Sequence, residues 1–241
     1  MQLACIRGHN RYCFIRYKVE IMDLFNHANA NPISVAADAY LLKAFALNVE
    51  TQVLADLQQS LLAAPLRHMM TPMGFAMSAA MTNCGDLGWV SDRKGYRYDA
   101  KDPNTGKLWP AMPDSFLALA KQAALTAGFN DFVPDACLIN QYKIGASMGL
   151  HQDKNEVDFN QPIVSVSLGL PAVFLFGGLL RSDKPHKVPL AHGDVLVWGG
   201  KSRLNFHGIR PVKASLVGAL NTPLSQYLNH HRVNLTLRKA A

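Results

Sequence analysis

Two histidines and one aspartate have the types and the spacing of a metal-binding set. His151 and Asp153 lie two positions apart, and His207 follows between Phe206 and Gly208. Residues two apart on a strand, or at its end, point the same way. Two imidazoles and one carboxylate leave three positions open on an octahedral metal, the pattern of non-haem Fe(II) oxygenases. A bare pair of this spacing is common by chance, so the assignment depends on what accompanies it.

A second polar set lies in the segment 232–238, where polar and apolar residues alternate. In a strand the polar residues of this segment share one face: Arg232, Asn234, Thr236 and Arg238. For a lone strand the simplest interpretation is a solvent-exposed polar face. Near a metal set, however, an arginine on such a face can hold the far carboxylate of a co-substrate in a bidentate pair.

The elements that must position these residues begin with two predicted helices. Residues 48–64 place apolar side chains at helical spacing, and Asn48 or Thr51 is a candidate cap. Residues 113–127 form a second helix, with Pro113 in its first turn and Gly128 at its end. The segment between them, 71–112, is rich in Gly, Tyr, Trp and Pro and is typical of hairpins and loops rather than core.

From about residue 135 the apolar residues no longer recur at helical spacing but at every second position. Segments 163–168 and 232–238 alternate, while 173–176 and 195–198 are short apolar runs bounded by glycines. Short strands with this punctuation predict a β-sandwich or jelly roll. The expected fold class is therefore α+β, mainly β, in which helices and loops pack on a jelly-roll core.

Length and composition limit the remaining possibilities. The 241 residues are 49% hydrophobic and have a net charge of +7, which fits a polyanionic partner but also an ordinary basic surface. No apolar stretch approaches the length of a membrane span. The four cysteines show no CxxC spacing, and we expect reduced thiols in the cytoplasm. Basic residues 1–21 are interpreted as a disordered extension or an incorrectly assigned start, with Met22 as the natural one.

Long collinear motifs extend these patterns into a family resemblance. Over roughly residues 22–238 the chain resembles the AlkB family of DNA-repair dioxygenases, which depend on Fe(II) and 2-oxoglutarate. The motifs that carry the resemblance include LHQDK at 150–154, PIVSVSLGLP at 162–171, HGDVLVWGG at 192–200 and RVNLTLR at 232–238. Further matches lie at 71–72, 77–89, 109–113, 135–142, 174–178 and 207–209.

The resemblance implies a double-stranded β-helix core over about 135–238 and a nucleotide-recognition lid over about 71–112, within one domain of residues 22–241. It implies Fe(II) ligands at His151, Asp153 and His207. It implies 2-oxoglutarate contacts from Asn140, Tyr142, Arg232, Asn234 and Arg238, with Arg232 on the distal carboxylate and Arg238 near the C1 carboxylate. It implies substrate contacts from Thr71, Met81, Trp89, Tyr96 and Arg181.

The activity implied is oxidative demethylation of N-alkylated bases, such as 1-methyladenine and 3-methylcytosine, with release of succinate, carbon dioxide and formaldehyde. The implied partner is alkylated DNA, preferably single-stranded, with RNA as an additional substrate, and we expect a monomer. Asn155 stands where the best-known member of the family has an acid, and an amide both donates and accepts hydrogen bonds, whereas a carboxylate only accepts them. Two alternatives remain: a 2-oxoglutarate-dependent hydroxylase of a small molecule or protein, and a non-catalytic jelly-roll binding module.

Overall fold

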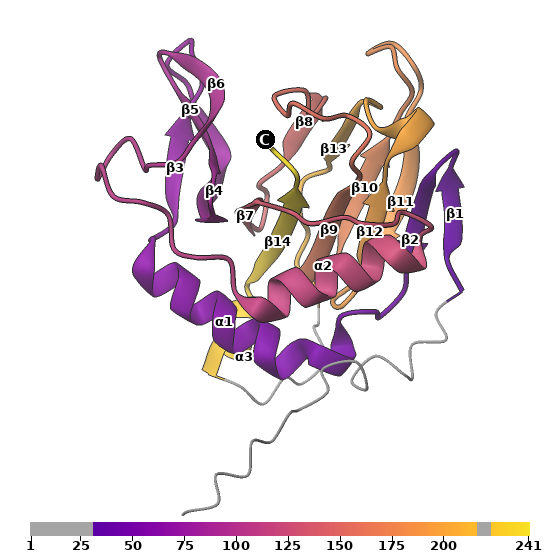
Figure 1. Ribbon diagram of the computed structural model, residues 1–241, viewed down its shortest axis with the longest axis horizontal. Helices are drawn as coiled ribbons and strands as arrows, with labels where there is room; N and C mark the ends of the chain where they lie inside the picture. The colour runs from indigo at the N-terminus through magenta and orange to yellow at the C-terminus, as the bar shows by residue number, and fades with distance from the viewer. Residues whose placement is uncertain (1–30, 216–222) are drawn as a thin grey trace, which may run out of the picture.

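A computed structural model of the chain describes residues 31–215 and 223–241. The basic extension predicted for residues 1–21 lies outside the described residues. Figure 1 shows two sheets of the β core, a hairpin that stands beside them, and helices packed across one side. Of the helices in the described ranges, none has the length and apolar composition needed to cross a bilayer.

The β core consists of two antiparallel sheets, and a third sheet is a separate hairpin. In spatial order the eight-stranded sheet contains β1 (Ile33–Ala36), β2 (Ala39–Leu42), β12 (Val195–Trp198), β9 (Ile163–Gly169), β14 (His231–Arg238), β7 (Ala136–Lys143), β4 (Ala76–Gly85) and β3 (Arg67–Met70). The four-stranded sheet contains β11 (His186–Leu190), β10 (Ala172–Phe176), β13 (His207–Ile209) and β8 (Met148–His151). The hairpin contains β5 (Gly88–Asp92) and β6 (Gly95–Asp99).

The helices agree closely with the two predicted segments. They are α1 (Glu50–Ala63), α2 (Asp114–Thr126) and α3 (Pro223–Leu228), with single 3-10 turns at Leu47–Val49 and Gly200–Ser202. Gly128 follows α2 with φ of +88°, the left-handed conformation expected at a helix end. The prediction of a side-chain cap on the first helix is wrong: the N-cap is Val49, which makes no side-chain cap bond.

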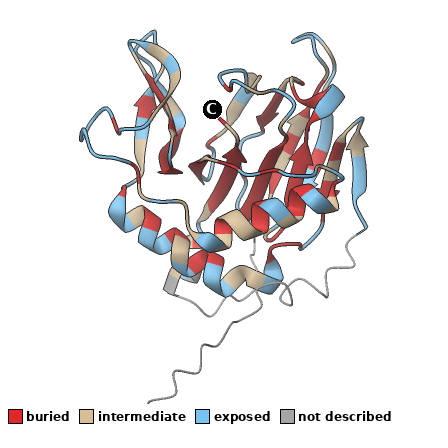
Figure 2. Cartoon of the chain, in the orientation of Figure 1, coloured by how far each residue is buried: buried red, intermediate tan, exposed pale blue. Residues whose placement is uncertain are grey.

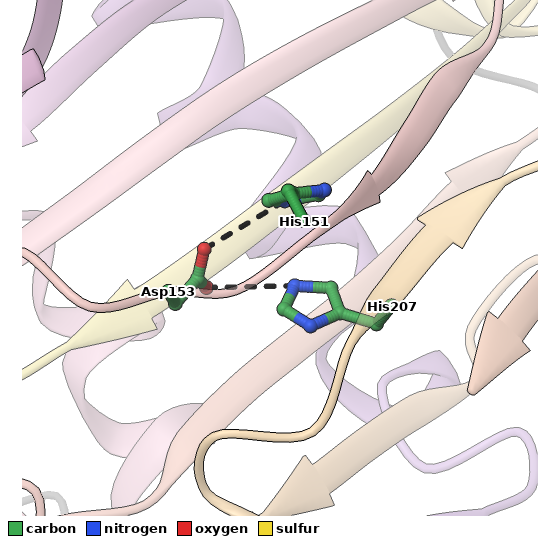
Figure 3. Close-up of side chains that lie close together, drawn as sticks. All are labelled: His151, Asp153 and His207. Atoms are coloured by element: carbon green, nitrogen blue, oxygen red, sulfur yellow. Dashed lines mark ion pairs between the residues drawn. The ribbon is translucent and has the colours of Figure 1, made fainter. Parts of the chain in front are cut away.

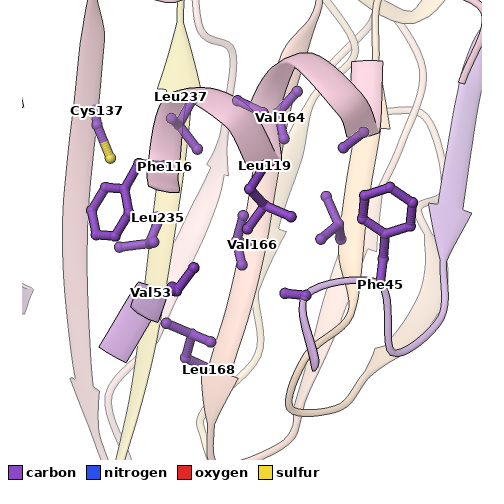
Figure 4. Close-up of a cluster of buried hydrophobic side chains, with 14 of the residues drawn as sticks. Phe45, Val53, Phe116, Leu119, Cys137, Val164, Val166, Leu168, Leu235 and Leu237 are labelled. Atoms are coloured by element: carbon purple, nitrogen blue, oxygen red, sulfur yellow. The ribbon is translucent and has the colours of Figure 1, made fainter. Parts of the chain in front are cut away.

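A first apolar core lies between the helices and the eight-stranded sheet (Figure 4). Phe116 and Leu119 of α2 and Val53 of α1 pack against the apolar residues of β9 and β14, such as Val166 and Leu235. These strand residues alternate with polar ones, so packing of the helices turns the polar face away from them. The period-two pattern thus fixes which face of each strand the helices cover.

A second apolar core lies between the two sheets. Leu196 and Trp198 of the large sheet pack with Phe174, Phe176 and other residues of the small one. The sheets therefore face each other, which confirms the predicted jelly-roll core. Figure 2 shows that the central strands of the large sheet, β12, β9 and β14, are buried along almost their whole length. The solvent-exposed interpretation of the polar face of β14 is wrong, because that face points into the sandwich and is buried from Arg232 to Arg238.

The expectation of hairpins and loops rather than core over 71–112 is wrong for β4. This strand spans ten residues, pairs with β7 in the large sheet and is buried from Ala79 to Gly85. Its Ala-rich sequence has a single β-branched residue, Thr82, and lacks the clear alternation that indicates a strand. Strands β1 to β3 also belong to the large sheet, although they precede residue 135, where the predicted jelly-roll region begins.

Candidate functional site

The three predicted metal ligands meet where β8 and β13 pair. These antiparallel strands belong to the small sheet, and their register places His207 directly opposite His151. Asp153 follows two residues after the end of β8. Strand pairing therefore joins residues 56 positions apart, and the chain just beyond β8 supplies the carboxylate.

The donor atoms of this triad surround a common point (Figure 3). They all lie within 4.8 Å of one another, and each Nε2 atom is 3.7 Å from an oxygen of Asp153. The Nδ1 atoms of His151 and His207 face the carbonyl oxygens of Gly149 and Asn205 at 2.9 and 3.0 Å. A carbonyl only accepts, so each Nδ1 carries the proton and each Nε2 lone pair is free for a metal.

The charges around the triad favour a neutral imidazole beside an ionised carboxylate. Burial, together with the neighbouring His151, lowers the pKa of His207 to about 4. Burial raises the pKa of Asp153, but Arg238 and the two imidazoles outweigh it and hold that pKa well below its usual value. Arg238 donates from Nε and Nη2 to Oδ2 of Asp153 at 2.9 and 2.6 Å. A neutral imidazole and an ionised carboxylate are the forms of these side chains that bind a divalent cation.

Arg232 is a buried cation that faces the same interior. It is 1% exposed, and burial lowers its pKa to about 10, so it stays charged near neutral pH. Its Nη2 donates to Oγ of Ser167 at 3.1 Å, whereas Nε and Nη1 have no hydrogen-bond partner among the residues that the structure describes. No carboxylate of the described residues lies within ion-pair distance of it. A buried guanidinium without a counter-ion is costly, so this one is suited to an anionic ligand.

The polar residues beside Arg232 form a fixed wall. Asn234 donates from Nδ2 to Oγ of Ser165 at 2.8 Å, and Thr236 donates to Oδ1 of Asn234 at 2.7 Å. On the neighbouring strand β7, Oδ1 of Asn140 is buried without a partner. Burial raises the pKa of Tyr142 to about 12, so its hydroxyl remains a donor. The wall therefore offers a polar ligand the free acceptor of Asn140, the unused N–H groups of Arg232, and a Tyr142 hydroxyl whose contact is Sδ of Met148 at 3.8 Å.

One cavity of about 670 Å³ joins these groups. Its lining contains all eight residues predicted for metal and co-substrate: His151, Asp153, His207, Asn140, Tyr142, Arg232, Asn234 and Arg238. It also contains four of the five residues predicted for substrate: Met81, Trp89, Tyr96 and Arg181. Thr71 does not line it, because the Thr71 side chain instead accepts a hydrogen bond from the backbone N–H of Phe75 in the exposed β3–β4 turn.

Trp89 is held over the cavity by three neighbours. The side chain of Asn83 on β4 bonds both the N–H and the carbonyl of Trp89 at 3.0 Å. The indole stacks on Tyr96 with ring centroids 5.6 Å apart and donates from Nε1 to Oδ1 of Asn155 at 3.2 Å. Gly88 approaches Trp109 so closely that a Cβ there would lie 2.4 Å from the indole nitrogen. The hairpin therefore presents a rigid aromatic surface to the cavity.

Sequence reasoning assigned no role to several residues that shape the site. Trp198 and Phe174 pack on the His207 ring, with centroids 5.2 and 5.7 Å away. Arg203 is 2% exposed and donates from Nη1 to the carbonyl oxygen of Asp153 at 2.9 Å. The short apolar runs 173–176 and 195–198 placed Phe174 and Trp198 on predicted strands, but no local pattern distinguishes Arg203 from a surface arginine.

The arrangement fits one metal ion and one dicarboxylate. The triad provides two neutral nitrogen donors and one anionic oxygen, a facial set that leaves coordination positions for other ligands. Arg232 lies in the same cavity with two unused donors, which match a carboxylate. The buried aromatic residues around His207 keep water from that side of the triad.

Comparison with known proteins points to a single family. The family model of the 2OG-Fe(II) oxygenase superfamily matches residues 38–238. The chain is 51% identical to the alpha-ketoglutarate-dependent dioxygenase AlkB of Escherichia coli, over 91% of this chain and 98% of the relative. It is 30% identical to the human nucleic acid dioxygenase ALKBH1, over 64% of this chain and 46% of that protein. The solved structure of OsALKBH1 superposes with a TM-score of 0.74 at 30% identity, covering 86% of this chain and 99% of that one.

Proposed function

We infer the function from a plain premise: the chain belongs to the AlkB family of the 2OG-Fe(II) oxygenase superfamily. We propose that it demethylates N-alkylated nucleobases in nucleic acid. As a member it is an Fe(II)- and 2-oxoglutarate-dependent dioxygenase. The substrates proposed are 1-methyladenine and 3-methylcytosine in DNA, with RNA as an additional substrate. The observation that carries the proposal is a triad of metal-binding donor atoms beside the buried guanidinium of Arg232, which has no carboxylate partner in residues 31–215 and 223–241.

In this proposal each residue has a separate task. His151, Asp153 and His207 hold iron, and Arg232 binds the distal carboxylate of 2-oxoglutarate through its unused guanidinium N–H groups. Asn140, Tyr142 and Asn234 line the co-substrate side, while Arg238 lies near the C1 carboxylate and holds Asp153 in place. When bound there, iron would activate dioxygen, the oxidant of the reaction: one oxygen atom would enter the succinate left by decarboxylation of 2-oxoglutarate, and the other would hydroxylate the N-methyl group. The hydroxymethyl group then leaves as formaldehyde, and the base keeps its ring nitrogen.

The nucleic acid side of the proposal rests on the aromatic surface of the hairpin. A target base must leave the stack before it can enter the cavity, where Trp89 and Tyr96 offer stacking and Met81 and Arg181 complete the pocket. Extrusion costs least from a single strand, so single-stranded DNA is the preferred substrate proposed. We further propose that Thr71 contacts the nucleic acid substrate from the exposed β3–β4 turn. The enzyme is also proposed to be a monomer and to be located in the cytoplasm.

A demethylation assay by mass spectrometry tests this function. Oligonucleotides with 1-methyladenine or 3-methylcytosine are incubated with Fe(II), 2-oxoglutarate and ascorbate, and His207→Ala serves as the control. We expect loss of one methyl mass with release of formaldehyde, absent in the control because a metal donor is missing. Succinate formation without demethylation would retain the oxygenase and reject the substrate. Neither product, with iron bound, would favour the binding-module alternative.

Asn155 is proposed to set the range of lesions. Its Oδ1 accepts the hydrogen bond from Trp89, so its amide N–H groups remain to donate in the cavity. Asn155→Asp replaces these donors with a second acceptor, which suits a base with an amino group at its edge rather than an oxo group. We expect the ratio of kcat/KM for 1-methyladenine over 1-methylguanine to rise about tenfold.

The two bases compared carry their methyl group at the same ring position, which isolates the effect of the amino and oxo groups. Competition between two oligonucleotides in one reaction, followed by mass spectrometry, measures the ratio directly. Asp158→Asn, a change of the same size in the loop beyond Glu156, is the control and should leave the ratio unchanged. An equal ratio in Asn155→Asp and the parent would remove Asn155 from base selection.

A further inference from the structure

The β5–β6 hairpin carries Trp89 and Tyr96 but belongs to neither sheet of the core. It forms its own two-stranded sheet beside β3 and β4 (Figure 1). An isolated two-stranded hairpin is marginally stable in water. Contacts with the rest of the chain must therefore decide where the hairpin lies over the cavity.

Two of these contacts reach the segment directly after the metal ligand Asp153. Tyr98 of β6 lies opposite Trp89 of β5, so both side chains share one face of the hairpin. The hydroxyl of Tyr98 donates to Oε1 of Glu156 at 2.6 Å, and the indole of Trp89 donates to Oδ1 of Asn155. Asn155 is an exposed residue, whereas Glu156 is only 6% exposed. The bond to Glu156 is therefore the better shielded of the two.

Glu156 is fixed by a buried charge network of two acids and two arginines. Its Oε2 lies 3.2 Å from Nη2 of Arg203, and its Oε1 lies 3.4 Å from Nε of Arg238. The same arginines bind Asp153: Arg238 at the carboxylate and Arg203 at the backbone carbonyl. All four side chains are at most 9% exposed. Opposite charges held this way in a buried site fix one another's positions.

We propose that Tyr98 is a positioning residue that docks the hairpin onto the Glu156–Arg203–Arg238 network. The same buried charges then set both the placement of Trp89 and Tyr96 over the cavity and the orientation of Asp153 below it. Tyr98 does not line the cavity, so its contribution to the reaction acts through the hairpin. A residue that merely fills space would act through its ring, which Tyr98→Phe retains.

Hydrogen exchange measured by mass spectrometry on the full-length protein tests the docking directly. In Tyr98→Phe we expect amides of residues 88–99 to exchange about tenfold faster, with β7 and β14 unchanged, because the hairpin alone loses one of its buried anchors, while its bonds to Asn83 and Met70 remain. Tyr40→Phe makes the same change on β2, at the opposite end of the large sheet from β3 and β4, and should not alter the hairpin. Unchanged exchange in residues 88–99 of Tyr98→Phe would overturn the proposal.

A kinetic measurement extends the test and rests on the proposed function. In Tyr98→Phe we expect the KM for a methylated oligonucleotide to rise about tenfold relative to the parent enzyme. The rate of 2-oxoglutarate turnover without nucleic acid, and the KM for 2-oxoglutarate, should stay within about twofold of the parent values. Equal losses in both reactions would indicate a general structural defect and would also reject the proposal. If the parent enzyme shows no demethylation, the proposed substrate fails, and the exchange experiment still decides whether Tyr98 docks the hairpin.

Discussion

Asp153→Ala is expected to abolish iron-dependent turnover, with a loss of at least about 100-fold in succinate formation. Asp153 supplies the only carboxylate of the triad, and its two oxygens face the two imidazoles at 3.7 Å. Without it, two nitrogen donors remain, and Arg238 keeps only its longer contact with Glu156, from Nε to Oε1 at 3.4 Å. The loss should appear in the affinity for Fe(II), measured by anaerobic titration, as well as in the rate.

Folding must be separated from metal binding in this test, because Asp153 also pairs with Arg238. Breaking a buried ion pair costs about 3–5 kcal/mol in the free energy of unfolding. Asp153→Asn keeps the shape of the side chain and one oxygen for Arg238, so it is the variant in which turnover should fall while the fold survives. Asp86→Asn, the same change at an exposed position, is the control. Full turnover in a folded Asp153→Asn protein would refute the metal assignment.

Replacement of Arg232 is expected to raise the 2-oxoglutarate requirement sharply while leaving the fold intact. Truncating one partner of a buried, hydrogen-bonded charge pair costs about 2–5 kcal/mol in the free energy of binding. This loss corresponds to a rise of about 30-fold or more in the KM for 2-oxoglutarate. Arg232→Ala measures this loss, and Arg210→Ala, an exposed arginine in the loop after β13, is its control. Unchanged dependence on 2-oxoglutarate would place the co-substrate elsewhere.

Arg232→Met makes the same test independent of turnover. Methionine keeps much of the apolar stem but removes a buried cation that has no carboxylate partner within the described residues. We expect the free energy of unfolding without ligand to be equal or higher by about 1–4 kcal/mol, because a desolvated charge is removed. Stabilisation by added 2-oxoglutarate should disappear at the same time. A strongly destabilised apo protein would instead make Arg232 a structural residue.

The helices and the alternating strands were predictable because local periodicity records which face is buried. Val233, Leu235 and Leu237 alternate with the polar residues of β14, and the helices cover the apolar side as that pattern requires. Long collinear motifs added the family, and with it the residues of the metal and co-substrate sites. Pattern alone left the polar face of β14 open between solvent exposure and a binding role, since alternation separates two faces but does not say what covers the second.

The order and types of residues therefore determined the two helices, the faces of the main strands and the chemistry offered by His151, Asp153, His207 and Arg232. Only the tertiary structure decided that β4 belongs to the core, that Thr71 lies outside the cavity, and that Glu156 and Arg203 join Asp153 in one buried charge network. The physical reason is that register and burial depend on partners far away in the chain. The pairing of His151 with His207 and the anchoring of Tyr98 by Glu156 are set by how the two sheets and the hairpin pack, which no local window of sequence contains.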